Sequence, residues 1–235
     1  MTADQTIHVA NKSSQVSDAD VKTMALACSK QIALHVAPAY GMLPVQVTFL
    51  ANGAPPPKSA RLITVMDTLD DAQALGYHTE DGAEHIWGVV GTKAAMDQGA
   101  KALTGPYSIS SILSHEVIEL FGDPRINLWA DNGRGTQVAV ELCDPVENDS
   151  YLVDGVAVSN FVYPAWFDHL AAKGDRFDYM GRLTRPFTMA RGGYWVEMKA
   201  GKTSQKFGED VPEWRRAAKQ AGFSRSHRRV LMGND

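Results

Sequence analysis

The stretch Ser108–Pro124, SISSILSHEVIELFGDP, decides the expected fold of this chain. Serine residues open it, apolar residues recur along it at helical spacing, and Gly122 and Pro124 close it. Serine is a favoured N-cap residue, whereas glycine and proline end helices, so the pattern predicts a helix over this stretch. Gly105 and Pro106 break the chain just before it.

The charged residues of this helix are not spread evenly around it. When each residue turns the helix by about 100°, four ionisable side chains fall on one arc beside the apolar face: His115, Glu116, Glu119 and Asp123. Glu116 lies within the apolar face itself. Burial of a lone carboxylate is costly unless it is paired or bound to a metal. The arc therefore indicates a functional site on this helix.

The segments on either side of the helix predict both helix and strand. We expect a helix over residues 21–37, strands over 45–51, 60–68 and 85–92, and short β-like segments over 136–144 and 154–167. Asp18 or Asp20 can cap the first helix, and Pro38 is expected to end it. Residues 67–84 read as polar and irregular. This order of elements predicts an α+β fold.

The composition is that of a globular protein with a substantial core. Hydrophobic residues make up 44% of the 235 residues and charged residues 21%, which excludes wholesale disorder, collagen-like repeats and a coiled coil. No apolar run approaches the roughly 18–20 residues of a membrane helix, and no secretory signal is recognisable. Two cysteines, Cys28 and Cys143, cannot build a disulfide framework. We therefore expect a protein that does not associate with a membrane and that is located in the cytoplasm or within a particle.

Charge divides the chain into an acidic body and a basic tail. Residues 202–235 contain eight Lys or Arg and four Asp or Glu, so they carry +4 and residues 1–201 carry −8. An acidic body argues against nucleic acid as the partner. We expect a polar arm over residues 1–17, one α+β domain over residues 18–201, and a tail that docks on another copy of the chain, on an assembly partner or on the acidic body.

His115 and Glu119 have the spacing of two ligands of one ion. Residues four apart lie about 6 Å apart along a helix axis and on the same face. Glu116, next to His115, would then point at a water bound to that ion. These three residues predict two metal ligands and a general base.

The sequence HEVIE, residues 115–119, resembles the HExxH motif of the zincin metallopeptidases, with Glu119 in place of the second histidine. Gly122 stands where the metzincins have the glycine that turns the chain back towards the metal. Arg125 occupies the place of their third histidine and cannot ligate. The resemblance covers about ten residues. It implies a zincin-like α+β fold, with a small mixed sheet packed on a central active-site helix, and Glu116 as the general base.

A third metal ligand must come from elsewhere in the chain. Asp123 lies about 12 Å from His115 on a straight helix, and it can turn back only if the helix breaks at Gly122. The other source is an acidic cluster that follows a predicted strand: Glu141, Asp144, Glu147 and Asp149. His85 and His169 are further imidazoles in the body of the chain.

The donor types leave several cations open. One imidazole with several carboxylates is a harder ligand set than imidazoles alone, so calcium, manganese and magnesium compete with zinc, which we expect first. The predicted function is a metal-dependent hydrolase, a peptidase acting on a peptide or protein, in which Glu116 transfers the proton. The alternative is a non-catalytic component of a large assembly, for example a virion, that retains a degenerate zincin-like scaffold. In that case the helix residues form a structural network with Arg125 or Arg134.

Overall fold

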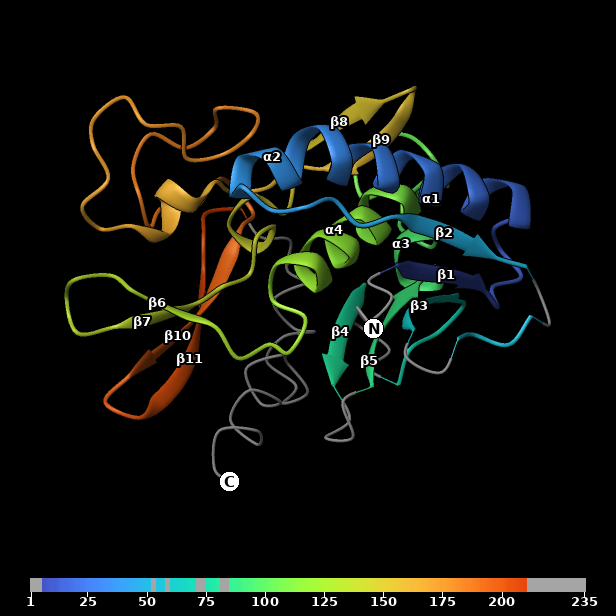
Figure 1. The fold of residues 1–235 in the computed structure, drawn as a ribbon, viewed down its shortest axis with the longest axis horizontal. Coiled ribbons are helices and arrows are strands. Elements are labelled where there is room, and N and C mark those ends of the chain that lie inside the picture. Colours follow the sequence, from blue (N-terminus) through green and yellow to red (C-terminus); the bar gives the residue numbers. More distant parts are fainter. Residues whose placement is uncertain (1–5, 52–53, 58–59, 71–74, 81–84, 211–235) are drawn as a thin grey trace.

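The largest sheet of the protein has five strands in the order β2-β1-β3-β5-β4 (Figure 1). The computed structural model describes residues 6–51, 54–57, 60–70, 75–80 and 85–210. The five strands are β1 Ile7–Asn11, β2 Val47–Leu50, β3 Arg61–Met66, β4 Gly76–Glu80 and β5 Ile86–Gly91. β1 runs parallel to β2 and β3, and β3 parallel to β5. β4 pairs antiparallel with β5 and forms one edge of the sheet.

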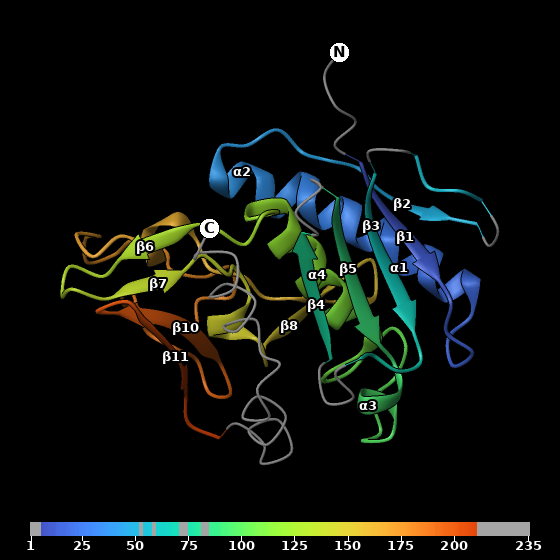
Figure 2. The ribbon, with the colours of Figure 1, turned by 90° about the horizontal axis from the view of Figure 1, so that it is seen from below.

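Two long helices pack on one side of this sheet (Figures 1 and 2). They are α1, Asp18–Gln31, and α4, Ile109–Gly122. α1 contacts β1 and β2, α4 contacts β3, β4 and β5, and the two helices contact each other. α3, Lys93–Met96, is a single turn that follows β5. The expected central helix is thus confirmed as α4, and a mixed sheet packs against it.

The first helix begins and ends differently from the expectation. Its N-cap is Ser17, whose side chain accepts a hydrogen bond from the backbone of Asp20 in a capping box. Pro38 does not end it, because the chain continues through a π-helical turn, Ile32–Val36, into α2, Ala37–Tyr40. Proline lacks a backbone N–H but is tolerated in the first turn of a helix, and Pro38 lies there in α2.

The main core lies between the sheet and the two helices. The strands contribute their alternate side chains to it, as expected for the side-chain period of two in a β-strand, and α1 and α4 contribute the apolar faces. Its fully buried members include Ile7, Val9, Ile63, Val65, Val90, Met24, Ile32, Ile109, Leu113 and Leu120.

The second half of the chain forms a four-stranded antiparallel sheet and a separate hairpin (Figure 1). The sheet has the order β11-β10-β7-β6, with β6 Trp129–Asp131, β7 Gln137–Ala139, β10 Tyr194–Lys199 and β11 Lys202–Phe207. The hairpin consists of β8 Ser150–Val153 and β9 Val156–Ser159, and β9 packs on α4. Short 3₁₀ turns occupy Asp144–Val146 and Pro164–Phe167.

The expected boundaries of the domain do not match these elements. The sequence predicts a polar arm over residues 1–17, but residues 7–11 form β1, which lies between β2 and β3 with Ile7 and Val9 fully buried. A five-residue strand is too short for its alternation to stand out in a polar segment. Residues 202–207 form β11 and pair with β10, so the basic segment begins inside a hairpin. Residues 211–235 lie outside the described residues, and the docking of the tail stays a prediction.

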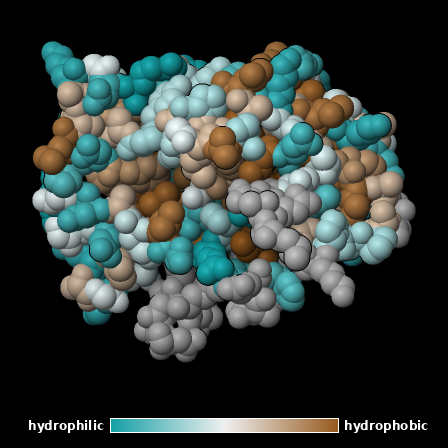
Figure 3. All heavy atoms as spheres, viewed as in Figure 1, coloured by the Kyte–Doolittle hydropathy of each residue, from teal (hydrophilic) through white to brown (hydrophobic). Residues whose placement is uncertain are grey.

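The fold is therefore mixed α and β, in agreement with the predicted α+β class. Among the described residues, no helix is long and apolar enough to cross a membrane. On the face drawn in Figure 3, hydrophobic side chains are dispersed among hydrophilic ones.

Candidate metal centre

α4 is enclosed on all sides, although the sequence gives it a polar arc. Twelve of its 14 residues are buried, including His115, Glu116 and Glu119. The sheet covers one side of the helix, and β9 and α1 cover the other. The polar arc therefore faces protein, and its carboxylates lie in the interior.

Small serine side chains hold α4 against the hairpin and α1. Ser108 caps the helix, and its side chain accepts from the backbone N–H of Ser111 at 3.2 Å. Ser114 Oγ donates to Gln31 on α1 at 2.7 Å and accepts from the backbone N–H of Ser159 on β9 at 2.9 Å. Gln31 in turn donates to the Ser159 carbonyl at 2.8 Å. This buried network fixes the rotation of α4 about its axis.

The end of α4 brings the acidic segment of residues 141–144 over the helix. A Cβ atom on Gly122 would lie 2.7 Å from the Leu142 side chain, so a larger residue there would displace that side chain. The backbone after Leu142 is held by β10 and its neighbours, since the Ala190 N–H donates to the Pro145 carbonyl at 2.9 Å. Tertiary packing, and not the helix, thus positions Glu141 and Asp144.

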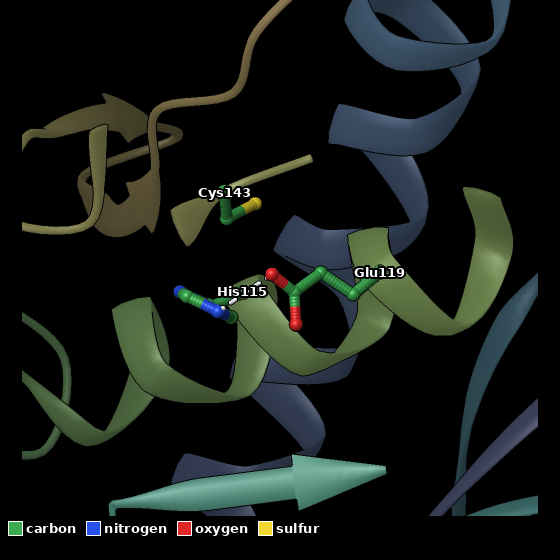
Figure 4. A group of neighbouring side chains, drawn as sticks. All are labelled: His115, Glu119 and Cys143. Carbon is green, nitrogen blue, oxygen red and sulfur yellow. Dashed lines mark ion pairs between the residues drawn. The ribbon is translucent and has the colours of Figure 1, made fainter. Parts of the chain in front are cut away.

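His115 meets carboxylates from two different segments. Its Nε2 atom lies 2.9 Å from Glu119 Oε1, one helical turn along α4, and 3.1 Å from Asp144 Oδ1. Cys143, on a different segment, faces His115 and Glu119 on the helix (Figure 4). One donor atom of each of these three residues lies within 4.8 Å of the others. An imidazole, a carboxylate and a thiol that converge in this way could hold a metal ion.

A second histidine, His78, reaches the cluster from the edge strand β4. Side chains alternate along a strand, so Gly76, His78 and Glu80 share the face that packs on α4. Tyr77, on the opposite face, packs with Leu69 and Val89. Gly76 permits close contact with the helix, because a Cβ there would lie 2.8 Å from Glu116 Oε1.

His78 lies between two glutamates and the end of α4. Its Nδ1 atom is 3.7 Å from Glu116 Oε2 and 3.9 Å from Glu119 Oε2, and its Nε2 atom is 3.1 Å from the backbone carbonyl of Asp123. Donor atoms of His78, Glu119 and Glu141 also lie within 4.8 Å of one another. Glu119 is therefore common to both groups.

These residues form one buried set, called here the α4 cluster: His78, His115, Glu116, Glu119, Glu141, Cys143 and Asp144. None of them is more than 6% exposed. The set contains four carboxylates and two imidazoles, so its formal charge is −2 even if both imidazoles are protonated. Buried negative charge of this size is strongly unfavourable without cations or protons to balance it.

Burial and the negative charge of the neighbouring carboxylates shift the pKa values of two members of the α4 cluster. Burial acts to lower the pKa of His115, but the charge of Glu119 and hydrogen bonds with Asp144 and Glu119 outweigh it and raise the pKa well above its usual value. Burial raises the pKa of the Cys143 thiol, and the charge of Glu119 raises it further. The raised pKa values favour the protonated forms of both side chains.

The structure brings together most of the residues that the sequence singled out. His115, Glu116, Glu119, Glu141 and Asp144 all belong to the α4 cluster. The Asp123 carboxylate does not belong to either of the two groups that could hold a metal ion, and it accepts hydrogen bonds from the backbone N–H groups of Asn127 and Leu128 at 3.2 and 3.0 Å.

Other candidates from the sequence lie outside the cluster. His85 and His169 are exposed. Asp149 is half-buried and pairs with Arg182 at 3.4 Å, and Glu147 is also only partly buried.

Sequence reasoning missed His78 and Cys143. His78 lies in a segment that read as irregular, and the alternation of GYHTE over five residues was the only signal for β4. Cys143 stands between two predicted acidic ligands in ELCD, and that position was the available signal.

Comparison of the chain with family models, with curated proteins and with solved structures gives no match. The α4 cluster is therefore the feature of the chain that points to a function.

Proposed function

We propose that this protein is a metal-dependent hydrolase of the zincin-like type that acts on a peptide or protein. In this proposal His115, Glu119 and Asp144 are the protein ligands of one divalent ion, and Glu116 is the general base. The contacts of His115 Nε2 with Glu119 Oε1 at 2.9 Å and with Asp144 Oδ1 at 3.1 Å carry the proposal, because they place three metal-binding side chains around one point.

The donor set fits the proposed ion. Two nitrogen or oxygen atoms bound to zinc at 2.0–2.2 Å in tetrahedral geometry lie about 3.3–3.6 Å apart, so the donor atoms around His115, which are 2.9 and 3.1 Å apart, need to separate by only a few tenths of an ångström to hold the ion. The nearby thiol of Cys143 favours zinc, since calcium prefers a shell of oxygen ligands. Manganese and calcium are the alternatives to zinc, because both bind carboxylate oxygens.

The fold supports the zincin-like part of the proposal in general terms. A mixed sheet packs on the helix that carries HEVIE, as the resemblance implies, and the structure adds that its edge strand β4 is antiparallel. The edge strand β4 lies next to Glu116, so the general base is at the border between helix and sheet.

The bound ion would polarise a carbonyl oxygen of the substrate and lower the pKa of a water molecule. Glu116 would accept the proton of the attacking water at its carboxylate and return it to the leaving amine. The enclosure of Glu116 between α4 and Gly76 restricts its rotamers and keeps bulk water away. His115 is the more exposed of the two histidines of the α4 cluster, at 6% against 1% for His78, so a path for substrate would have to open on its side.

A second function is favoured by the depth of the cluster. Glu119, Asp144 and Cys143 are fully buried, which suits an ion that stabilises the fold of a non-catalytic assembly component. The two functions share the metal site and differ in the role of Glu116.

The variant Glu116→Gln separates them. In the hydrolase, the wild-type protein cleaves members of a broad peptide library, and Glu116→Gln reduces the rate by at least about 100-fold with unchanged metal content. Glu80→Gln, on the α4-facing side of β4, serves as the matched control and retains full activity. A wild-type protein that binds metal but cleaves nothing in the library would support the structural function instead. A protein that binds no divalent ion would exclude both.

A further inference from the structure

The α4 cluster contains a second group of donor atoms that the proposed hydrolase does not use. His78, Glu119 and Glu141 each place a donor atom within 4.8 Å of the others, and all three side chains are buried. They come from β4, from α4 and from the segment after β7, so three separate elements converge there. This convergence is not accounted for by the ion at His115.

The ring of His78 is oriented to bind a cation through Nδ1. Its Nε2 atom is 3.1 Å from the Asp123 carbonyl, and a carbonyl oxygen only accepts, so Nε2 carries the proton. In the neutral ring the lone pair is then on Nδ1. Many histidine ligands of metals are held in the same way, with the second nitrogen donating to a backbone carbonyl.

The lone pair of His78 faces two carboxylate oxygens at distances that suit a shared cation. Glu116 Oε2 is 3.7 Å and Glu119 Oε2 is 3.9 Å from Nδ1, which is too long for hydrogen bonds. Two nitrogen or oxygen atoms bound to one ion at 2.0–2.2 Å in tetrahedral geometry lie about 3.3–3.6 Å apart, so these oxygens need to move by only a few tenths of an ångström to share a cation with Nδ1. A cation between these atoms removes the repulsion between the lone pair and the carboxylates.

Glu119 presents one oxygen to each group. Oε1 lies 2.9 Å from His115 Nε2, and Oε2 lies on the side of His78. A carboxylate divided in this way is suited to bridge two ions, which in two-metal sites lie about 3.5–4 Å apart. Two divalent ions would also neutralise the four carboxylates of the α4 cluster with both imidazoles uncharged.

We propose that the α4 cluster binds two divalent cations that share Glu119, with the second ion held by His78 and Glu141. This inference rests on the proposed metal site at His115 and adds a second site beside it. Glu116 borders the second ion through Oε2, so the state of that site controls the environment of the proposed base.

The test is the number of metal ions bound by the full chain. After chelation and gel filtration, the protein is loaded with Zn²⁺ or, separately, with Mn²⁺, and bound metal is measured by mass spectrometry. We expect two equivalents for the wild type, one for His78→Gln and one for His115→Gln. His169→Ala, which removes an exposed histidine, is the matched control and retains two.

Other outcomes separate this inference from the proposed function. One equivalent in the wild type that is lost in either histidine variant would show a single site and overturn the second ion alone. Two equivalents that persist in His78→Gln would place the second ion elsewhere and also overturn it. No bound metal would overturn both proposals. If His78→Gln does not fold, anomalous scattering from zinc-loaded crystals of the wild type decides, because one of two peaks must lie against His78 and Glu141.

Discussion

Gly76→Ala should destabilise the protein through a clash with Glu116. A Cβ atom at this position would lie 2.8 Å from Glu116 Oε1, 3.0 Å from its Cγ and 3.0 Å from the Val89 carbonyl. Ordinary contacts begin at 3.4 Å, so the carboxylate must move by about 0.6 Å in an enclosed space. Overpacking of this kind costs about 1–3 kcal/mol, which corresponds to a fall in Tm of roughly 2–12 °C for a chain of this size.

A double-mutant cycle measures how much of this loss of stability comes from the contact with Glu116. The wild type, Gly76→Ala, Glu116→Ala and the double variant are unfolded with urea in the presence of EDTA, so that bound metal does not contribute. We expect Ala at position 76 to cost at least about 1 kcal/mol less when Glu116 is absent, because only the contact with Val89 remains.

Gly88→Ala is the matched control for this cycle. It introduces a methyl group into the neighbouring strand β5, where the closest atoms belong to Tyr77, His78 and Ile63 and not to Glu116. Its cost should be additive with that of Glu116→Ala within about 0.5 kcal/mol. The same additivity for Gly76→Ala would refute the placement of Glu116 beneath β4, and with it the geometry assumed for the general base.

Two further predictions concern metal removal and the tail. Chelation should lower the Tm measured by calorimetry, by about 8–16 °C for each occupied site relative to protein with metal at 1,000 times its Kd, since such binding contributes about 4 kcal/mol per site. The His115→Ala variant should lose the part of that response that comes from the ion at His115, and an equal response in both proteins would contradict the proposed site. Truncation after Asp210, which leaves β11 intact, should change the oligomeric state or stability at low salt and less at high salt, because salt screens surface charge pairs. Light scattering and thermal unfolding at two salt concentrations test this, whereas salt-sensitive RNA binding that the truncation abolishes would indicate nucleic acid as the partner of the tail.

Elements with strong local signals could be predicted from the sequence. α4 has serine at its start, a dense apolar pattern and a glycine at its end, and the structure places it at Ile109–Gly122 within the predicted stretch. β3 and β5 are apolar runs within segments expected to be strands. β1 and β4 were missed, because five residues with polar neighbours carry too little periodicity.

The candidate site divides in the same way. The juxtaposition of His115 and Glu119 follows from helix geometry alone, since residues four apart meet on one face. The choice between Asp123 and Asp144 did not follow, because it depends on where the chain goes after α4. The Asp123 carboxylate accepts hydrogen bonds from backbone N–H groups just after α4, whereas the chain folds back so that Asp144 contacts His115.

The sequence by itself determined that one helix carries an imidazole and a carboxylate one turn apart on the same face, because hydrogen bonds within the helix set that spacing whatever surrounds it. Only the tertiary structure decided that this polar arc is buried, and that His78, Glu141 and Cys143 meet it there. These contacts join segments far apart in the chain, as in the bond from His78 to the Asp123 carbonyl, 45 residues away. Their positions follow from sheet order and from close packing at Gly76 and Gly122, which a local pattern of residues does not encode.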